Sequence, residues 1–526
     1  MKILVCDRIS EKGRAVLMKA SGLTVNYQPD LNQDQLPGEI QDAAALIVRS
    51  RTQVTAEVIE AASQLRVIGR AGAGVDNIDL DTATQKGILV MNTPGGNSIS
   101  AAEHAFALLI ALARKLPGAD ASVKAGGWNK AAFVGQELRG KTLGVLGLGQ
   151  IGSLLARRAQ AFQMRVIAYD PFVGQSYAGD LEVTLSDLTS VVQESDFLSL
   201  HLPLTEETRE IINRNTLSLM KPGAFLINAA RGGLISEDDL LDFLEEGRLG
   251  GAALDVFQNE PQVNERLLRS DRVILTPHIA GSTVEAQEQV GHTIATQVVD
   301  YLEKSLIANA VNFPSLSSGE LEKITPFLNL ASRLGTFASQ VCGIRISSIG
   351  IRYYGDLTGV DYRPISNHIL KAVLQPMLAE PVNEVNARTY ASQRGIEVIE
   401  TASTRSRDHA NLISLQLRNA DETGWVEGAI LHQGKMWLVS VDGIPLETPL
   451  GDYVLFIRNQ DTPGVIGAVG TILGESAVNI ASFVLGREDT LSQALGIINT
   501  DNPVPEEVMT RIRKIPAISY AQLIEL

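Results

Sequence analysis

Three side chains in the middle of the chain combine residue types that could oxidise an alcohol. Arg231 and His278 each follow an apolar run expected to form a strand, and Glu260 lies on the loop after another such run. His278 could accept a hydroxyl proton, while Glu260 could fix the tautomer of that imidazole and stabilise its charged form. The forked guanidinium of Arg231 could hold a carboxylate and polarise the oxygen that becomes a carbonyl. Together they predict hydride removal, although alone His278 could pack beside Pro277 and the other two could be surface charges.

A glycine-rich run upstream could hold the cofactor that accepts such a hydride. It follows an apolar stretch, residues 142–146, and precedes a helix-prone stretch, residues 153–162. The first glycine would allow a tight turn, the second would let the backbone approach a pyrophosphate, and the third would let helix and strand pack closely. The N–H groups and the dipole of the helix start would hold the phosphates. The residues assigned to this loop are Gly147, Gly149, Gln150, Ile151 and Gly152.

An acidic residue after the next apolar run indicates which nicotinamide cofactor binds. Asp170 closes residues 164–169 and is placed to accept hydrogen bonds from an adenosine ribose. Its charge would repel the 2′-phosphate of NADP. Glycine runs often mark ordinary loops, but here strand, turn, helix, second strand and acidic residue come in the order of a dinucleotide site. The sequence therefore predicts that NAD binds. The glycine run does not show which reaction the protein catalyses.

The composition limits the partners that this chain can have. At 526 residues it is too long for one core and should form about three or four domains. A hydrophobic content of 45% beside 20% charged residues is typical of a soluble globular protein. The net charge of −15 argues against nucleic acid or an anionic membrane as the main partner, and the sequence has no apolar run of about 20 residues. An anionic substrate would therefore need a local basic pocket.

The cysteines and histidines do not have the spacing of a disulfide framework or a metal site. Cys6 and Cys342 are far apart in sequence, which suits a reducing cytoplasm. The apolar run at the N-terminus is too short for a signal peptide and is predicted to be a buried first strand. No metal is predicted, because five other histidines lack metal-ligand spacing with cysteine or with each other: His104, His292, His368, His409 and His432.

Alternating strands and helices predict two doubly wound, parallel-sheet α/β domains in the first part of the chain. Strands are expected at 3–5, 44–48, 67–69 and 89–91, and after the glycine run at 197–201, 224–228, 252–254 and 273–275. Between the two sets, an apolar stretch at 100–116 should be ended by Pro117 and Gly118. Residues 283–306 have apolar residues at helical spacing and could pack back on the first domain. Residues 309–319 are expected to be a linker.

The rest of the chain predicts two smaller α+β units without a nucleotide motif. The first has a helix at 321–334, alternation at 344–352, a helix after Pro364, and a hairpin that pairs 426–431 with 435–441 across 432–434. The second has strand, helix, strand, strand, helix and strand at 453–459, 465–475, 480–485, 493–499, 505–515 and 518–526. That βαββαβ order is ferredoxin-like.

Five groups of residues together resemble the signature of the D-isomer-specific 2-hydroxyacid dehydrogenases. They are the glycine run, His201-Leu202-Pro203 with Thr208, residues 228–233, Leu254-Asp255-Val256-Phe257 with Glu260-Pro261, and Pro277-His278. The resemblance covers about residues 1–307 and implies that Arg231, Glu260 and His278 are the catalytic residues. It implies that Asp255 faces the nicotinamide amide. It also implies NAD contacts from Leu202, Thr208, Ala229, Ala230, Arg231, His278 and Gly281.

A second histidine competes for the role of the base. His201 also ends an expected strand, that of residues 197–200. Pro203 and Thr208 indicate instead that this segment is a loop lining the cofactor. His278 is therefore the preferred base.

Arginines in the first domain indicate the kind of acid that binds. Arg49 and Arg51 follow an expected strand and Arg70 precedes a glycine loop, so they could hold a phosphate, although strand-end arginines are often solvated. Both segments resemble the phosphoglycerate dehydrogenases of the family. That resemblance implies that Lys130, beside Trp128, acts in the neighbouring subunit's site; many relatives have arginine there, and lysine keeps the charge but loses the fork. The implied substrate contacts are Arg49, Arg51, Arg70, Asn97 and Lys130.

The C-terminal unit resembles an ACT domain, an amino-acid-sensing module, through residues 459–465 and 478–480. Asp461 and Asn479 could bind the ammonium and carboxylate groups of an amino acid, with L-serine as the candidate effector. The segment around Asp461 could equally be only a turn and a helix cap. Relatives that bind serine often carry an aromatic residue where Asn459 stands. The unit before it resembles the intervening domain of the long phosphoglycerate dehydrogenases.

The resemblance implies a complete division of the chain and a reaction. A substrate domain would be split into residues 1–97 and 285–307 around an NAD domain at 98–284, followed by an intervening domain at 319–450 and an ACT domain at 452–526. The implied reaction is oxidation of 3-phospho-D-glycerate to 3-phosphohydroxypyruvate with NAD, the first step of L-serine biosynthesis, in a cytoplasmic homotetramer.

Two kinds of alternative stay open at this point. A glycerate/hydroxypyruvate reductase or a D-lactate-type dehydrogenase would share the catalytic residues, but neither needs a phosphate clamp or an ACT tail. A non-enzymatic NAD-sensing corepressor could share the whole catalytic unit. Such a corepressor would be expected to end in a disordered tail, whereas residues 453–526 have a folded pattern.

Overall fold

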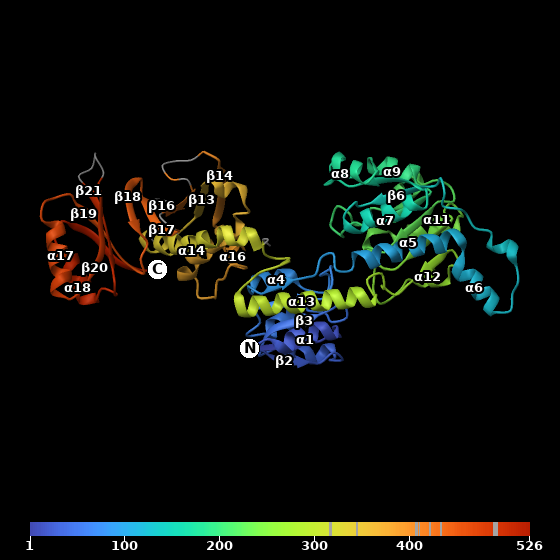
Figure 1. The fold of residues 1–526 in the computed structure, drawn as a ribbon, viewed down its shortest axis with the longest axis horizontal. Helices are drawn as coiled ribbons and strands as arrows, with labels where there is room; N and C mark the ends of the chain where they lie inside the picture. The colour runs from blue at the N-terminus through green and yellow to red at the C-terminus, as the bar shows by residue number, and fades with distance from the viewer. Residues whose placement is uncertain are drawn as a thin grey trace.

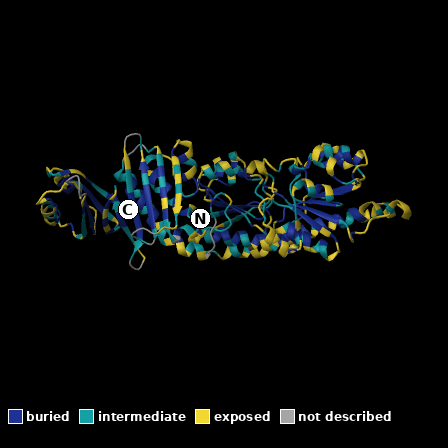
Figure 2. Cartoon of the chain, turned by 90° about the horizontal axis from the view of Figure 1, so that it is seen from above, coloured by how far each residue is buried: buried dark blue, intermediate teal, exposed yellow. Residues whose placement is uncertain are grey.

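The computed structural model describes residues 1–314, 318–342, 346–405, 409, 411–419, 422–431, 434–487 and 493–526. We call its parts the first unit (1–97 and 284–314), the second unit (98–283), the third unit (318–449) and the fourth unit (453–526). The fourth, third, first and second units follow one another along the long axis of the molecule (Figure 1). The strands inside the units are largely buried, and exposed residues lie on the outer faces of helices (Figure 2). No helix of the described residues is both long and apolar enough to cross a membrane.

The first unit is built on a five-stranded parallel sheet in the order β2-β1-β3-β4-β5. Helices α1 and α13 pack on one face, and α2, α3 and α4 pack on the other. Covering on both faces explains why the central strands are continuously apolar rather than alternating. The elements are β1 (Lys2–Val5), α1 (Glu11–Lys19), β2 (Thr24–Tyr27), α2 (Leu36–Glu39), β3 (Ala43–Val48), α3 (Ala56–Ala61), β4 (Val67–Arg70), α4 (Leu80–Gln85), β5 (Leu89–Met91) and α13 (Val284–Lys304).

Helix α13 joins the first unit although it follows the second unit in sequence. Its apolar side, with Ile294 and Val298, packs on the sheet next to Gly69. A Cβ at Gly69 would lie 2.8 Å from side-chain atoms of both residues, so the close packing requires glycine. The helix therefore closes a core that the N-terminal residues cannot complete alone.

The structure corrects the prediction of a linker after α13 for residues 309–314. Ala310 forms an antiparallel bridge with Met91, and the Val311 N–H donates to the Val90 carbonyl at 2.7 Å. The Asn312 side chain completes the pairing, because its Oδ1 accepts the Val90 N–H at 2.9 Å and its Nδ2 donates to the Ile88 carbonyl. These bonds satisfy the free edge of β5. Residues 315–317 of the expected linker lie outside the described residues.

The second unit has a seven-stranded parallel sheet in the order β12-β11-β10-β9-β6-β7-β8. The strand order reverses between β6 and β9, and ligands bind beside such a switch point at the carboxyl ends of the strands. Helices α5 and α7 pack on one face, and α9, α10 and α11 pack on the other.

The sheet strands of the second unit are β6 (Thr142–Leu146), β7 (Arg165–Tyr169), β8 (Thr184–Leu185), β9 (Phe197–Leu200), β10 (Phe225–Asn228), β11 (Gly251–Leu254) and β12 (Val273–Leu275). The helices are α5 (Ser98–Arg114), α6 (Leu116–Lys124), α7 (Gln150–Ala161), α8 (Gln175–Asp180), α9 (Leu188–Glu194), α10 (Arg214–Leu219), α11 (Glu237–Glu245) and α12 (Glu265–Arg269).

A second correction concerns the end of the long apolar helix α5. Lys115, with a φ of 53°, breaks the helix, and Pro117 then lies in the first turn of α6. Proline is well tolerated there, because the first N–H groups of a helix have no partner within it. Pro117 and Gly118 thus begin a new helix instead of ending the old one. This helix projects from the end of the molecule (Figure 1).

The third unit has a mixed six-stranded sheet in the order β14-β13-β15-β16-β17-β18, in which only β13 and β14 are parallel. The predicted hairpin is confirmed as β16 and β17, and residues 432–433 of its turn lie outside the described residues. The elements are α14 (Ser318–Val341), β13 (Ser348–Gly355), α15 (Arg363–Leu374), α16 (Ala387–Gln393), β14 (Glu397–Ser403), β15 (Asn411–Arg418), β16 (Thr423–Leu431), β17 (Lys435–Val441) and β18 (Ile444–Pro449).

The fourth unit has the predicted βαββαβ order. Its antiparallel sheet runs β20-β21-β19-β22, with α17 and α18 on one face. The elements are β19 (Tyr453–Gln460), α17 (Val465–Glu475), β20 (Ile480–Arg487), β21 (Gln493–Thr500), α18 (Glu506–Arg513) and β22 (Ile518–Glu525).

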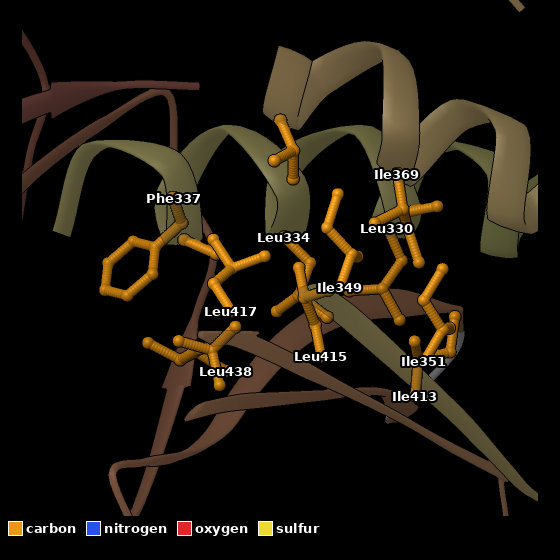
Figure 3. Close-up of a cluster of buried hydrophobic side chains, with 14 of the residues drawn as sticks. Leu330, Leu334, Phe337, Ile349, Ile351, Ile369, Ile413, Leu415, Leu417 and Leu438 are labelled. Carbon is orange, nitrogen blue, oxygen red and sulfur yellow. The ribbon is translucent and has the colours of Figure 1, made fainter. Parts of the chain in front are cut away.

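The third and fourth units share one hydrophobic core. Leu330, Leu334 and Phe337 of α14 point towards the sheet of the third unit (Figure 3). The same cluster continues into the other face of the ACT-like sheet through residues such as Phe456, whose ring meets that of Phe337 edge-on with centroids 5.8 Å apart. Because this cluster spans both sheets and β18 lies beside β20, we expect the third and fourth units to unfold together.

A core substitution tests this shared packing. Phe337→Ala should lower the free energy of unfolding of the third and fourth units by about 3–5 kcal/mol, because it leaves a cavity between them. Urea unfolding followed by hydrogen exchange and mass spectrometry measures this, because peptides of the two units are followed separately, whereas the fourth unit has no tryptophan to report its unfolding. Phe172→Ala is the matched control, because Phe172 is 95% exposed in the second unit. Separate transitions for the third and fourth units would contradict a shared core.

Candidate active site

The glycine loop between β6 and α7 has the shape of a dinucleotide cradle. A Cβ at Gly147 would lie 2.6 Å from the His201 carbonyl oxygen, and one at Gly152 would lie 2.0 Å from the Gly147 oxygen. At Gly149, no atom of the described residues beyond the adjoining backbone lies within 4 Å of the position of a Cβ. The fold therefore needs the first and third glycines for its own packing, while the second leaves an open face for a pyrophosphate.

Asp170 lies at the end of β7, beside this loop. Its Oδ2 accepts the N–H of Leu148 at 2.8 Å, and its Oδ1 accepts the N–H of Phe172 at 2.9 Å. The carboxylate thus fixes the loop and stands where the ribose of a bound dinucleotide would lie. The open glycine loop, the start of α7 and this acid fit NAD.

Glu260 and His278 form a hydrogen-bonded pair. His278 Nδ1 lies 2.7 Å from Glu260 Oε2, and Glu260 Oε1 accepts the N–H of Phe257 at 3.1 Å. Burial raises the pKa of Glu260, but the hydrogen bond and charge of His278 outweigh it and the pKa lies below its ordinary value. Glu260 is therefore ionised at neutral pH and fixes one ring nitrogen. Nε2 of His278 makes no hydrogen bond within the described residues, so it can accept a proton.

The loop of His278 is held by a buried carboxylate. His278 has a φ of 52°, and its own N–H donates to the Asp255 backbone oxygen at 2.8 Å. The Asp255 side chain accepts the N–H groups of Ile279 and Ala280 at 2.9 and 2.8 Å and the Thr276 hydroxyl at 2.6 Å. Asp255 is 0% exposed in this structure, and its predicted contact with a nicotinamide amide stays a prediction. Its hydrogen bonds make it the anchor of the His278 loop.

His104, which its spacing in the sequence only excluded as a metal ligand, is a polar partner in this cluster. Its Nε2 lies 3.3 Å from Asp255 Oδ1 and 3.2 Å from the Thr276 hydroxyl oxygen. Burial raises the pKa of Asp255, but the hydrogen bonds from His104, Thr276 and the loop N–H groups bring it below its ordinary value. A usable signal was present in the sequence, because His104 stands between Ala101 and Leu108 on the buried side of α5.

Arg231 belongs to the second unit, and its side chain contacts residues of the first unit. Its Nε lies 2.9 Å from Asp76 Oδ2, and its Nη1 donates to the Ala230 carbonyl at 2.7 Å. A Cβ at Gly74 would lie 2.1 Å from Arg231 Nη2, so the loop after β4 needs glycine to admit the guanidinium. The Asn228 side chain fixes the backbone around it by donating to the Arg231 oxygen and accepting the Ala230 N–H.

Arg70 of the first unit lies near the guanidinium groups of Arg231 and Arg49. Burial lowers the pKa of Arg70 to about 10, and the charges of Arg231 and Arg49 act in the same direction, against Asp76 and Asp7. Arg231 and Arg49 are therefore each close enough to Arg70 to repel its charge. The Nε of Arg70 is buried without a hydrogen-bond partner among the described residues. An anion placed between the arginines would relieve both the repulsion and the unpaired donor.

The arginines predicted to contact the substrate differ in how many of their guanidinium N–H groups already form hydrogen bonds within the protein. Arg51 donates from Nε to Asp7 at 2.8 Å and from Nη2 to the carbonyl oxygens of Cys6 and Pro29 at 2.6 Å. The guanidinium of Arg49 has a single long contact of 3.4 Å, to the Arg8 oxygen. Arg51 keeps only Nη1, which has a long contact of 3.4 Å to the Leu31 oxygen, for a phosphate. The structure therefore favours Arg49 and Arg70.

Other predicted cofactor and substrate contacts lie at the junction of the first and second units or on the loops after β9 and β10. A Cβ at Gly281 would meet the Asn97 amide nitrogen at 2.6 Å, so these two residues are neighbours at the junction of the units. The Thr208 hydroxyl donates to the Pro203 oxygen at 2.7 Å and stabilises the loop after β9, while Leu202 is buried. Ala229 and Ala230 follow β10 directly.

Lys130 and His201 stand apart from the pair formed by Glu260 and His278. Lys130 is exposed on a short 3-10 helix (Lys130–Phe133) beyond α6, and Trp128 next to it is 79% exposed. His201 bonds through Nε2 to the Ser199 hydroxyl at 2.9 Å, and burial lowers its pKa to about 4. Such a weak base is poorly matched to a hydroxyl proton. This argues for His278.

The predicted effector residues are each paired elsewhere. Asp461 Oδ2 lies 3.4 Å from Arg487 Nε, and Asn479 Nδ2 donates to Asp501 at 2.6 Å. Asp461 precedes α17 and Asn479 precedes β20. No three histidine, cysteine, aspartate or glutamate side chains of the described residues are grouped to hold a metal ion.

Three family models match the chain. The model described as D-isomer specific 2-hydroxyacid dehydrogenase, NAD binding domain, matches residues 106–280. The D-3-phosphoglycerate dehydrogenase intervening domain matches residues 323–442, and the ACT domain matches residues 453–517. These matches confirm the resemblances found in the sequence and show that the second unit is an NAD-binding domain.

Relatives align over the whole chain. The D-3-phosphoglycerate dehydrogenase of Synechocystis sp. is 41% identical over 100% of this chain and 95% of its own, and that of Bacillus subtilis is 36% identical over 100% and 99%. A solved structure of D-lactate dehydrogenase from Aquifex aeolicus, complexed with NAD and lactic acid, is 30% identical and covers 60% of this chain and 100% of its own with a TM-score of 0.52. The chain therefore belongs to the D-3-phosphoglycerate dehydrogenase family of NAD-dependent 2-hydroxyacid dehydrogenases.

Proposed function

We propose that this protein oxidises 3-phospho-D-glycerate to 3-phosphohydroxypyruvate with NAD, as the first step of L-serine biosynthesis. One observation carries the proposal: an imidazole paired with a carboxylate lies on the same sheet edge as an arginine that joins a cationic cluster of the first unit. The relatives that match along the whole chain carry the name of this activity.

His278, Glu260 and Arg231 have different roles in the proposed oxidation. His278 Nε2 takes the proton of the C2 hydroxyl, while Glu260 holds the other ring nitrogen and stabilises the imidazolium. When bound, NAD supplies the acceptor for the hydride that leaves C2. Arg231 exchanges its bond with Asp76 for the substrate carboxylate and polarises the oxygen that becomes the carbonyl. Asp76 can release the arginine readily, because its side chain is 64% exposed.

The phosphate group is assigned to Arg49 and Arg70. Arg49→Ala should raise the KM for 3-phospho-D-glycerate by about 10–100-fold, because a charge-assisted hydrogen bond contributes about 1.5–3 kcal/mol. The KM for D-glycerate should change little, since it has no phosphate. Steady-state kinetics with both substrates measures the difference, and equal effects on the two would remove Arg49 from the phosphate site.

Asp255 and His104 are proposed as positioning residues for the His278 loop. His104→Leu should lower kcat by about 10–100-fold, because the buried Asp255 carboxylate loses a partner worth about 1–3 kcal/mol. The Kd for NADH should stay nearly constant, and His104→Gln, which keeps an N–H donor, should recover part of the rate. Stopped-flow kinetics together with NADH fluorescence titration checks this. An unchanged kcat in His104→Leu would show that the contact is only structural.

The assembly is proposed to be a cytoplasmic homotetramer that contains dimers of the second unit. Support comes from the projecting α6 region, where apolar side chains are exposed: Leu116, Val123, Trp128 and Val134. Pairing through this region would bring Lys130 to the neighbouring subunit's site.

L-serine is proposed as the effector at Asp461 and Asn479. The domain division is proposed as 1–97 with 285–307, 98–284, 319–450 and 452–526.

A further inference from the structure

A buried acidic side chain lies behind the loop that carries Glu260. Glu237 is the first residue of α11 and is 7% exposed, whereas its neighbour Asp238 is exposed. An acid in the first turn of a helix interacts favourably with the helix dipole without being buried. Carboxylates are rarely buried unless the protein supplies partners for them. The burial of Glu237 therefore indicates a role beyond that of an acid at a helix start.

The hydrogen bond that Glu237 accepts comes from the loop after β11. The backbone N–H of Gln258 donates to Glu237 Oε1 at 2.8 Å. The Gln258 side chain binds the same segment, because its Nε2 donates to the Ile235 carbonyl at 2.9 Å. The loop is thus attached to residues 235–237 through both the backbone and the side chain of Gln258.

The preceding N–H group of this loop holds the carboxylate that pairs with His278. The Phe257 N–H donates to Glu260 Oε1 at 3.1 Å, and Glu260 Oε2 lies 2.7 Å from His278 Nδ1. Two successive N–H groups, those of Phe257 and Gln258, therefore bind Glu260 and Glu237. Consecutive peptide groups are rigid planes joined at one Cα, so the placement of the Gln258 N–H limits where the Phe257 N–H can point.

A glycine closes the other side of the same peptide group. A Cβ at Gly232 would lie 1.9 Å from the Phe257 carbonyl oxygen and 2.7 Å from the Gln258 nitrogen. The peptide group between Phe257 and Gln258 is therefore packed against the backbone of Gly232 and bonded to the side chain of Glu237. Without the Glu237 bond, packing alone would hold this peptide group in place.

We propose that Glu237 is a positioning residue for the oxidation and acts on His278 through Glu260. The inference rests on the proposed function, in which Glu260 fixes the His278 tautomer and stabilises the imidazolium. When the Gln258 N–H loses its acceptor, the loop shifts and Glu260 Oε2 moves away from the imidazole. Arg231 is held by separate bonds, so binding of the substrate carboxylate is preserved.

Steady-state kinetics of Glu237→Leu with 3-phospho-D-glycerate tests the proposal. The value of kcat should fall by about 10–100-fold, because a misplacement of about 1 Å at a reacting group can cost about 10²-fold. The KM for the acid should stay within about threefold, since the arginines proposed to bind it are untouched. A kcat within about twofold of that of the unmodified protein, or a loss that falls on KM alone, would overturn the proposal.

Two conservative variants separate the hydrogen bond from the charge. Glu237→Gln keeps an oxygen acceptor at the same reach and should recover most of the lost kcat. Glu237→Asp keeps the charge, but its carboxylate is withdrawn by one C–C bond, about 1.5 Å, and should not recover it. Recovery in Glu237→Asp that equals or exceeds that in Glu237→Gln would show that only charge at the start of α11 matters, and would overturn the proposal. This comparison decides the question if Glu237→Leu does not fold.

Glu246→Leu is the matched control, because it removes an exposed acid that directly follows the last residue of α11. Neither kcat nor KM should change. A loss of kcat in Glu246→Leu as large as that in Glu237→Leu would mean that any alteration of α11 slows the reaction, and would overturn the specific role of Glu237.

Crystal structures distinguish a failure of this inference from a failure of the proposed function. In Glu237→Leu, the distance from Glu260 Oε2 to His278 Nδ1 should exceed about 3.5 Å, which breaks the hydrogen bond. In Glu246→Leu it should stay near 2.7 Å. An intact pair in Glu237→Leu would overturn the inference whatever the substrate is. An unmodified protein that forms no NADH from 3-phospho-D-glycerate would contradict the proposed function, and this distance would then decide the inference alone.

Discussion

Replacing His278 by alanine is expected to lower kcat for oxidation of 3-phospho-D-glycerate by about 10³-fold, because general-base catalysis typically contributes about 10²–10⁴-fold. The imidazole is the group whose free Nε2 can take the hydroxyl proton, and Glu260 already occupies the other nitrogen. NADH should bind nearly as tightly as before, since the glycine loop and Asp170 are untouched. Initial-rate kinetics and NADH fluorescence titration measure the two effects separately.

The matched control for this variant is His292→Ala. His292 is an exposed residue of α13, so its loss should leave kcat within about twofold of the unmodified protein. Turnover retained in His278→Ala would discard the assignment of the base. A loss of NADH binding in parallel with turnover would mean that the loop had been disrupted, and would likewise remove the support for a purely catalytic role.

Arg231→Lys is expected to lower kcat/KM by about 10²–10³-fold although the charge is kept. The arginine presents two parallel donors to a carboxylate, and lysine offers a point charge that cannot hold it bidentately. The loss should fall on both kcat and KM, because the same side chain binds the carboxylate and polarises the reacting oxygen. Steady-state kinetics with 3-phospho-D-glycerate provides the measurement.

An exposed arginine of the same unit supplies the control. Arg269→Lys alters a surface ion pair with Glu265 in which both side chains are 79% exposed, so kcat/KM should not change. If Arg231→Lys were as active as Arg269→Lys, the two parallel donors of the Arg231 guanidinium would have no role. The substrate carboxylate would then have to bind elsewhere.

The sequence predicted the site best where local geometry fixes residue type. Gly147 has a φ of 95° in the turn after β6, and Gly152 lies against the Gly147 oxygen in the same turn and helix, so their spacing carries the motif. Strands such as β3 and β10 were found because burial on both faces makes them continuous apolar runs. The βαββαβ order of the fourth unit followed from regular alternation between clear turn signals.

The sequence was less informative where partners come from distant segments. Residues 309–314 pair with β5 through backbone groups and the side chain of Asn312, and no periodicity marks such pairing. Edge strand β2 is short and half-polar, which hides it among loops. Pro117 was interpreted as a helix end, but the break occurs at Lys115, where the backbone adopts a positive φ.

Two features of the site, the contact of His104 with Asp255 and the bonds of Arg51, also depend on partners that are distant in the sequence. His104 and Asp255 are 151 positions apart, and only the packing of α5 on the second sheet brings them within 3.3 Å. Arg51 looked as free as Arg49 in the sequence, but folding places it against the carbonyl oxygens of Cys6 and Pro29. Residue type predicted the chemistry of the site, and tertiary contacts decide which candidates remain available.

The proposed function is best tested by comparing NADH formation from 3-phospho-D-glycerate with NADH formation from D-glycerate. The value of kcat/KM for the phosphorylated acid should exceed that for D-glycerate by about 100-fold or more, because two arginines contribute about 1.5–3 kcal/mol each. Equal kcat/KM values for the two acids, or no NADH from either, would contradict it.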